Sequence, residues 1–206
     1  MAPAMCCTGS AGVAVLERVL ADIKDAGALS ILDIKRGDIG STMAAYAEAY
    51  LAEGAPLAAD AVTVSPYLGF ESLMPAFELA VANKRGVYVL ARTSNPEGGQ
   101  VQLAMGPEGT VAQDIIDRAT ELNSRARTRA IWLVIGGTHS SLMCDVSQFN
   151  ASILVPGIGH QGGRVEDLPA LFGDAVDQVL PVVGRGVVSA GPDAAALRAR
   201  VLRFAS

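Results

Sequence analysis

The sequence predicts an α/β fold built around a parallel β-sheet. Six short apolar runs alternate with helical segments along the 206 residues, and this alternation is typical of βα units. The runs are continuously apolar, which indicates strands that are buried on both faces, as in a parallel sheet. No Asn-Gly hairpin signal separates them. Both a doubly wound sheet and a (β/α) barrel fit this pattern, although a complete barrel needs eight strands.

The first three elements are recognised from spacing, charge and composition. Ala11–Ala26 is expected to form a helix, because apolar residues recur there every three or four positions and Gly27 follows. A strand begins at Ser30 and ends in a charged stretch. Residues 41–53 are rich in alanine and precede Gly54, which predicts the second helix.

The same alternation continues to the end of the chain. Further strands are expected where β-branched and other apolar residues run together, at Ala61–Ser65, Gly86–Ala91, Ala130–Ile135, Ala151–Val155 and Gln178–Val183. Further helices are expected between and after them, at 71–83, 111–124, 139–148 (a short, weak signal), 166–173 and 193–204. Residues 92–109 are rich in glycine and proline and are expected to form a long loop.

Composition limits the location and the partners of this chain. Residues 1–10 are expected to be an unstructured N-terminal segment without signal-peptide features, and residues 11–206 a single domain. The net charge of −5 argues against nucleic acid or an anionic membrane as a partner, and no apolar run is long enough to span a bilayer. The three cysteines match neither a disulfide framework nor a zinc site, which favours a reducing cytoplasm.

The first predicted strand ends in a cluster of charged side chains. Asp33 and Lys35 are two residues apart, so on an extended strand they project from the same face. Asp38 follows just beyond Gly37, where a loop is expected. The carboxyl end of a parallel strand is where a barrel carries its catalytic groups. The alternative is a strand that ends in ordinary solvated charges.

Two glycine-containing loops are candidates for binding a phosphate. Residues 157–162 match the G-x-G-x-x-G pattern, but Pro156 precedes them and no helix begins within the motif, so a dinucleotide site is not favoured. Glycine-rich backbone can still wrap a phosphate closely. Arg185, between two glycines after the last strand, can form a bidentate pair with such a group. His160 lies in the first loop without a partner at ligand or nucleophile spacing, and its role stays open.

Several motifs together resemble one enzyme family. Residues 33–42 read Asp-Ile-Lys-Arg-Gly-Asp-Ile-Gly-Ser-Thr and resemble the D-x-K-x-x-D-I-x-x-T signature of orotidine 5′-phosphate decarboxylase. The resemblance continues, in the order of the family and after successive predicted strands, at 65–69, 93–96, 156–163 and 184–185. Ser-Pro-Tyr-Leu-Gly at 65–69 is similar to a bacterial branch of that family.

The resemblance implies a TIM-type (β/α)₈ barrel that works as a homodimer. It implies decarboxylation of orotidine 5′-phosphate to UMP in pyrimidine biosynthesis, with neither a cofactor nor a metal. Lys35 would be the general acid, and Asp33 would lie beside the departing carboxylate. Asp38, Ile39 and Thr42 would reach into the site of the partner subunit.

The resemblance also assigns the groups that hold the substrate. Ser94 would contact the pyrimidine ring, and Gln161 and Arg185 would grip the phosphate. Pro156 would line the site, and the backbone of Gly184 would lie near the phosphate. The loops 92–109 and 157–163 are the candidates for closing over the ligand.

The chain departs from the family pattern at its N-terminus. Six of eight βα units are recognisable, and the first two strands, which carry a further lysine and a ribose-binding aspartate in the family, have no counterpart before Ala11. Lys24 lies on a predicted helix and cannot replace that lysine. We therefore expect a truncated barrel with an exposed sheet edge, poor solubility and activity far below that of a complete family member.

Two other functions compete with this one. The first is a related sugar-phosphate barrel of the hexulose-phosphate synthase or ketogulonate-phosphate decarboxylase type, which shares the D-x-K-x-x-D core and often uses magnesium. The second is a non-catalytic fragment that at most binds nucleotide or a full-length chain. Ile39, Thr42 and the loop from Gln161 to Gly163 favour the decarboxylase.

Overall fold

A curved, parallel sheet of six strands forms the centre of the molecule. The computed structural model describes residues 9–205, and the sheet order within them is β1-β2-β3-β6-β7-β8. Every neighbouring pair in this sheet is parallel. The strands are β1 (Ile31–Arg36), β2 (Ala61–Val64), β3 (Gly86–Arg92), β6 (Ile131–Ile135), β7 (Ile153–Val155) and β8 (Val179–Pro181).

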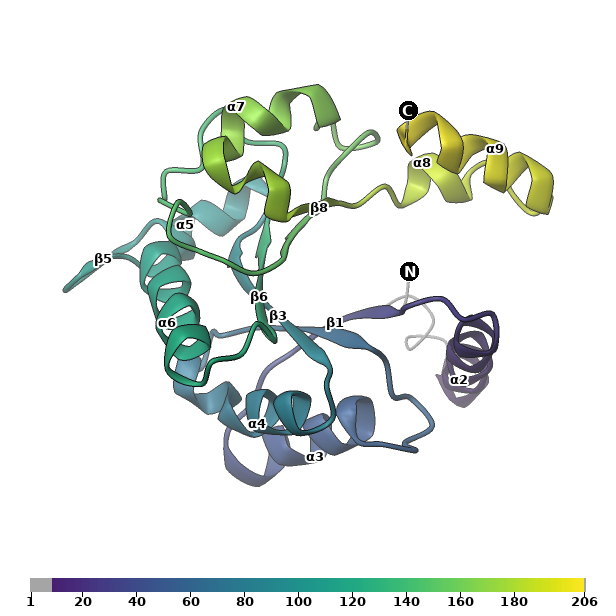
Figure 1. The fold of residues 1–206 in the computed structure, drawn as a ribbon, viewed down its shortest axis with the longest axis horizontal. Coiled ribbons are helices and arrows are strands. Elements are labelled where there is room, and N and C mark those ends of the chain that lie inside the picture. Colours follow the sequence, from purple (N-terminus) through teal and green to yellow (C-terminus); the bar gives the residue numbers. More distant parts are fainter. Residues whose placement is uncertain (1–8, 206) are drawn as a thin grey trace.

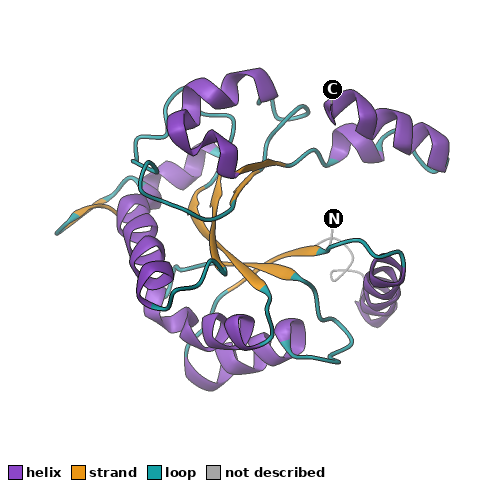
Figure 2. Ribbon diagram, in the orientation of Figure 1, coloured by secondary structure: helices purple, strands orange, loops and turns teal. Residues whose placement is uncertain are grey.

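Helices follow the strands and cover the outer side of the curve (Figure 1). Figure 2 shows strands inside and helices outside, the arrangement of a (β/α) barrel. The α-helices are α2 (Gly9–Asp25), α3 (Gly40–Leu51), α4 (Met74–Ala82), α5 (Gly99–Gln102), α6 (Val111–Arg125), α7 (Leu168–Phe172), α8 (Arg185–Val188) and α9 (Ala194–Ala205). Short 3₁₀ turns are η1 (Phe70–Leu73), η2 (Pro96–Gly98), η3 (Val165–Asp167) and η4 (Gly173–Gln178). None of the described helices is long and apolar enough to cross a membrane.

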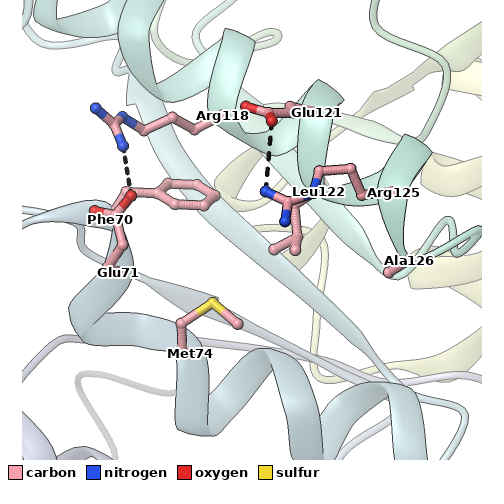
Figure 3. A pocket seen from close by; sticks show the side chains of 8 residues that line it. All are labelled: Phe70, Glu71, Met74, Arg118, Glu121, Leu122, Arg125 and Ala126. Atoms are coloured by element: carbon pink, nitrogen blue, oxygen red, sulfur yellow. Dashed lines mark hydrogen bonds and ion pairs between the residues drawn. The ribbon is translucent and has the colours of Figure 1, made fainter.

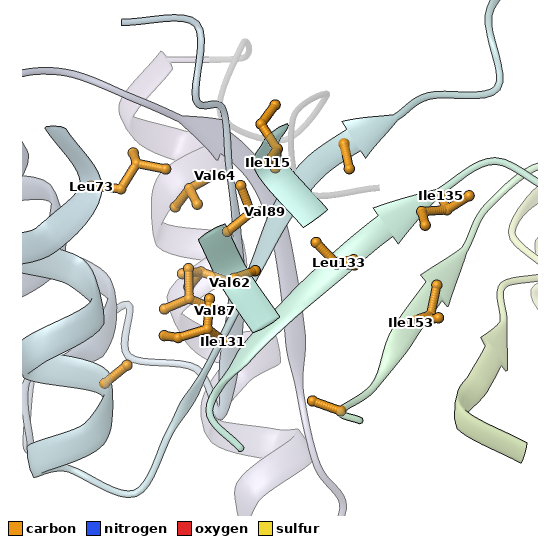
Figure 4. Packing of buried hydrophobic residues seen from close by; sticks show 14 of the residues in the cluster. Val62, Val64, Leu73, Val87, Val89, Ile115, Ile131, Leu133, Ile135 and Ile153 are labelled. Carbon is orange, nitrogen blue, oxygen red and sulfur yellow. The ribbon is translucent and has the colours of Figure 1, made fainter. Parts of the chain in front are cut away.

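The main core lies between the sheet and its helices. Val62, Val87, Ile131, Leu133 and Ile153 point outward from four adjacent strands and are buried against the helices (Figure 4). A smaller cluster, formed by Ala61, Tyr88, Val134 and Leu154, lies on the inner face of the sheet. Alternate residues of each strand therefore pack on opposite faces, which explains why the strands read as continuous apolar runs.

The sheet does not close on itself. Within residues 9–205, β1 pairs only with β2 and β8 only with β7, so these two strands are its edges. Apolar side chains are partly exposed on both, with Ile31 at 40% and Leu180 at 42%. The prediction of an α/β fold with six recognisable βα units in an incomplete barrel is confirmed. The prediction of poor solubility stays a prediction.

Gly27 ends the first helix, as the sequence predicts. Gly27 adopts a φ of +71°, which glycine tolerates at the end of a helix. Its N–H bonds to the carbonyl of Lys24, and the N–H of Ala28 bonds to that of Ile23. The helix begins at Gly9, two residues inside the segment expected to be unstructured. The rest of that segment, residues 1–8, lies outside the described residues.

Three segments differ from the prediction. Residues 139–148 form no helix, because Ser141 and Asp145 side chains accept hydrogen bonds from nearby backbone N–H groups and Gln113 holds both backbone groups of Asp145. The loop 92–109 is partly ordered: it contains η2, α5 and most of a small antiparallel hairpin, β4 (Met105–Gly106) with β5 (Gly109–Thr110). Short helix α8 was also not predicted.

Candidate active site

A cavity of about 810 Å³ opens at the carboxyl ends of the strands. Residues from all six strands or the loops after them line it, which is the position expected of a site in a (β/α) barrel. Its lining consists of Ile31, Asp33, Lys35, Thr63, Tyr67, Leu90, Thr93, Ser94, Asn95, Gly98, Val101, Gln102, Val134, Leu154, Pro156, Gln161 and Val182. The predicted site residues Asp33, Lys35, Ser94, Pro156 and Gln161 are therefore brought together.

An ion pair forms one wall of this cavity. Lys35 Nζ lies 2.5 Å from the carboxylate of Asp33, and the two side chains are 48% and 41% exposed. Thr63 on the neighbouring strand contacts both residues. Its hydroxyl donates to Asp33 Oδ1 at 2.8 Å and accepts from the backbone N–H of Lys35 at 2.9 Å. The pair thus combines a fixed cation and a fixed anion at one point of the cavity.

Polar groups suited to binding line another part of the same cavity. Ser94, which follows β3, donates its hydroxyl to Gln161 Oε1 at 3.1 Å, and Gln161 belongs to the glycine-rich loop after β7. Thr138 donates to the carbonyl of Ser94 at 2.9 Å. A Cβ at Gly136 would lie 2.5 Å from Ser94 Cα, so only glycine allows this close approach of the two loops.

A partly buried network of hydrogen bonds holds Thr93, the residue that precedes Ser94. Gln102 bonds to the N–H of Thr93 at 3.0 Å and to its hydroxyl at 2.8 Å, and His139 Nε2 donates to the Thr93 carbonyl at 2.9 Å. Arg92, only 7% exposed, reaches Gln102 at 3.3 Å and His139 Nδ1 at 3.5 Å. Burial is the largest influence on the pKa of His139 and lowers it. The hydrogen bond to the Thr93 carbonyl raises this pKa and the charge of Arg92 lowers it, and the net effect is a lowered pKa. Burial also raises the pKa of the nearby Cys144 thiol to about 11.

The second residue predicted to bind the phosphate, Arg185, lines a different cavity. Arg185 begins helix α8, directly after Gly184, and lines a cavity of about 590 Å³ with His160, Arg200 and other residues of that end of the chain. Arg200 donates to the carbonyl of Gly186 at 3.1 Å and fixes the turn that carries Arg185. Gln161 and Arg185 therefore line two different cavities.

Three further predicted residues, Asp38, Ile39 and Thr42, line neither of these two cavities. Asp38 accepts a hydrogen bond from the N–H of Ile39 at 2.8 Å, just before helix α3. Ile39 is 62% exposed, and Thr42 is exposed in the first turn of that helix. These three residues form a surface segment next to the carboxyl end of β1.

A further pocket, of about 440 Å³, lies on the outside between η1, α4 and α6 (Figure 3). Phe70, Met74 and Leu122 provide its apolar surface, and ion pairs of Arg118 and Arg125 with acidic neighbours border it. It lies among the outer helices, and none of the residues expected to carry chemistry lines it. No cluster of His, Cys, Asp or Glu that could hold a metal ion occurs among residues 9–205.

Comparison with known proteins places this arrangement in a family. The sequence pattern that describes the orotidine 5′-phosphate decarboxylase/HUMPS family matches residues 5–200. The chain belongs to this family. An orotidine 5′-phosphate decarboxylase of Salinispora tropica is 52% identical over 192 residues, which are 92% of this chain and 69% of that protein. One of Streptomyces coelicolor is 49% identical over 199 residues, or 96% of this chain and 72% of that protein.

A solved structure of the orotidine 5′-phosphate decarboxylase family has the same fold. A crystal structure from Streptomyces avermitilis, described as an orotidine 5′-phosphate decarboxylase, superimposes with a TM-score of 0.90 at 50% identity. The match covers 96% of this chain and 70% of that one. The predicted resemblance to the bacterial branch is thus confirmed, and the sugar-phosphate alternative is not favoured.

Sequence reasoning missed the groups that support the family's site residues. Thr63, Gln102, Arg92 and His139 contact the predicted residues or their direct neighbours. Thr63 lies in a run of apolar strand residues, where a threonine is an ordinary strand former, so composition gives no signal. The other three become neighbours only through the packing of two loops.

Proposed function

We propose that the chain is a carboxy-lyase that converts orotidine 5′-phosphate to UMP without a cofactor or a metal. The observation that carries this proposal is the Lys35–Asp33 pair, which lines the same cavity as the hydrogen-bonded residues Ser94 and Gln161. The names of the similar bacterial proteins support the same reaction.

Electrostatic stabilisation by Lys35 is the central step of the proposed reaction. The bond between C6 of the pyrimidine and its carboxylate breaks, CO₂ leaves, and the electron pair stays on C6. This vinylic carbanion has no electron sink, so a charge fixed in advance must stabilise it. The ammonium of Lys35 supplies that charge and then transfers a proton from Nζ to C6. Asp33 lies beside the departing carboxylate and orients Lys35.

We assign substrate binding to the polar residues around Ser94 and to the adjacent loops. Ser94 contacts the pyrimidine, with Pro156 lining the site, and Gln161 and Arg185 hold the phosphate near the backbone of Gly184. Gln161 and Arg185 line adjacent cavities, so one phosphate would have to lie between them. Closure of the loops 92–109 and 157–163 over the phosphate would use remote binding energy to position the ring.

A homodimer would complete the site. Asp38, Ile39 and Thr42 lie on a surface segment outside the cavity, and Ile39 exposes a large apolar side chain. We propose that these residues enter the site of a second subunit, as the family resemblance implies. Neither nucleic acid nor a membrane is expected as a partner, and the cytoplasm is the expected location.

The test is conversion of orotidine 5′-phosphate by the purified chain, with UMP detected by chromatography and with a chelator present throughout. UMP formation that the chelator does not reduce is the expected result. Absence of UMP would contradict the proposal and favour the non-catalytic fragment, whereas turnover of a pentulose phosphate that requires magnesium would favour the sugar-phosphate alternative.

A further inference from the structure

Among the strand residues that the structure describes, Thr63 is the one that bonds to both Asp33 and Lys35. It lies in the middle of β2 and is only 1% exposed. Its hydroxyl donates to Asp33 Oδ1 at 2.8 Å and accepts from the N–H of Lys35 at 2.9 Å. The direction of both bonds is fixed, because an ionised carboxylate only accepts and a backbone N–H only donates.

The backbone of β1 is irregular where it carries the pair. Leu32 is opposite Val62 and Arg36 is opposite Val64, so three residues of β1 face the single residue Thr63. Such a bulge interrupts the ladder of backbone hydrogen bonds and redirects side chains. The Thr63 hydroxyl takes the place of a backbone acceptor for the N–H of Lys35.

Lys35 also has a backbone conformation that needs support. Its φ is +48°, in the left-handed region that residues other than glycine rarely adopt. Strained residues of this kind persist where their surroundings determine them, and they often lie at functional sites. The hydrogen bond from Lys35 N–H to Thr63 is the contact on the neighbouring strand that holds this conformation.

We propose that Thr63 is a positioning residue, whose single hydroxyl fixes the side chain of Asp33 and the backbone of Lys35 relative to each other. This inference rests on the proposed function of the pair. Without the hydroxyl, the Lys35 N–H loses its partner and the Asp33 carboxylate loses the bond that orients it. The ammonium would then be misplaced relative to C6 of the substrate, which affects the chemical step more than binding.

The experiment compares variants that separate the hydroxyl from the shape of the side chain. Thr63→Val keeps the branched shape and removes the hydroxyl, and Thr63→Ser keeps the hydroxyl in a smaller side chain. Thr63→Ala and Thr63→Ser differ only in the hydroxyl. Thr120→Val, on helix α6, is the matched control, because the Thr120 hydroxyl also makes a hydrogen bond with a main-chain group, donating to the Ile116 carbonyl, but lies in the outer layer of helices.

Two readouts decide the outcome. We expect kcat of Thr63→Val and Thr63→Ala to fall roughly 10- to 100-fold with KM almost unchanged, whereas Thr63→Ser and Thr120→Val stay near the wild-type kcat. We also expect the amide of Lys35 to exchange its hydrogen roughly tenfold faster in the Val and Ala variants than in the wild type and Thr63→Ser.

Equal kcat values across all variants, or a serine variant as impaired as the alanine variant, would overturn the role of the hydroxyl. If Thr63→Val does not fold, the serine and alanine variants alone decide. If the wild type forms no UMP, the proposed function is contradicted, but exchange at Lys35 still shows whether Thr63 holds the pair. Exchange that is the same in all variants would overturn the positioning itself.

Discussion

The edge strand β1 and the central strands β3 and β6 are built in opposite ways. The Lys35–Asp33 pair on β1 is nearly half exposed, and β1 has one neighbouring strand among the described residues. Arg92 and Thr93, at the end of β3, lie between two strands and are held by a network with Gln102 and His139. The proposed proton donor therefore lies on an edge strand, whereas the more extensive hydrogen-bond network lies at the end of a central strand of the same sheet.

This difference shows what each region contributes. The central strands bury large apolar side chains completely, so they supply the free energy of folding. The edge strand contributes charge, and its geometry depends on individual hydrogen bonds. One set joins Ser30 to Asp60 at the start of β1, and the other joins Thr63 to the Lys35–Asp33 pair. Substitutions in the two regions should thus separate activity from stability.

The largest effect is expected from Lys35→Ala. It removes the proposed proton donor and the charge that stabilises the carbanion, so turnover of orotidine 5′-phosphate should fall roughly 10²- to 10⁴-fold. Its ion pair with Asp33 is exposed and adds little to stability, so the melting temperature should stay close to that of the wild type. Product formation and thermal unfolding measure the two effects.

The matched control for this prediction is Lys24→Ala. Lys24 is exposed in the last turn of helix α2 and does not line the cavity. This variant should keep wild-type turnover. A comparable loss of turnover in both lysine variants, or a Lys35→Ala variant that is fully active, would show that β1 does not carry the chemistry.

A smaller effect, measured on stability, is expected from paired isoleucine substitutions. Ile131 begins the central strand β6 and is fully buried, whereas Ile31 begins the edge strand β1 and is 40% exposed. Ile131→Ala should lower the free energy of unfolding by about 2–5 kcal/mol, and Ile31→Ala by less than about 2 kcal/mol. Denaturant unfolding of both variants gives the comparison. Equal losses would mean that the edge strand is packed as tightly as the centre.

The sequence allowed the central strands to be predicted better than the site. Continuous apolar runs such as Ile131–Ile135 predict buried strands from composition alone, and Gly27 marks a helix end through its left-handed conformation. Asp33 and Lys35 were identified because they are close in sequence. The contact between Ser94 and Gln161 joins residues 67 positions apart and follows only from the curvature of the sheet.

Two kinds of information could not be obtained from the sequence. The bulge that places three residues of β1 opposite Thr63 depends on the pairing of two strands, and neither strand shows it alone. The segment 139–148 has apolar spacing suited to a helix, but serine and aspartate side chains compete for its backbone N–H groups. In both cases a hydrogen bond from a backbone N–H to a side-chain oxygen replaces regular structure.

The smallest expected effect is a dependence of stability on pH that originates in the central network. His139 donates from Nε2 to the Thr93 carbonyl and directs Nδ1 at Arg92, so the fold requires the neutral imidazole. Its pKa in the folded protein is lowered by burial and by Arg92. As the pH falls below about 6.5, His139 therefore becomes protonated in the unfolded chain before it does so in the folded protein. The free energy of unfolding decreases between that pH and the lower pKa of folded His139. The thiol of Cys144 stays protonated throughout, because its pKa is about 11.

Melting temperatures at about pH 7.5 and about pH 5.5 measure this contribution, since histidine titrates between them and carboxylates do so at lower pH. The wild type should lose more stability over this interval than His139→Gln. The exposed His160, outside the network, provides the control: His160→Gln should behave like the wild type. If His139→Gln loses as much stability as the wild type, the network tolerates a charged imidazole, and the centre of the sheet is held by apolar packing alone.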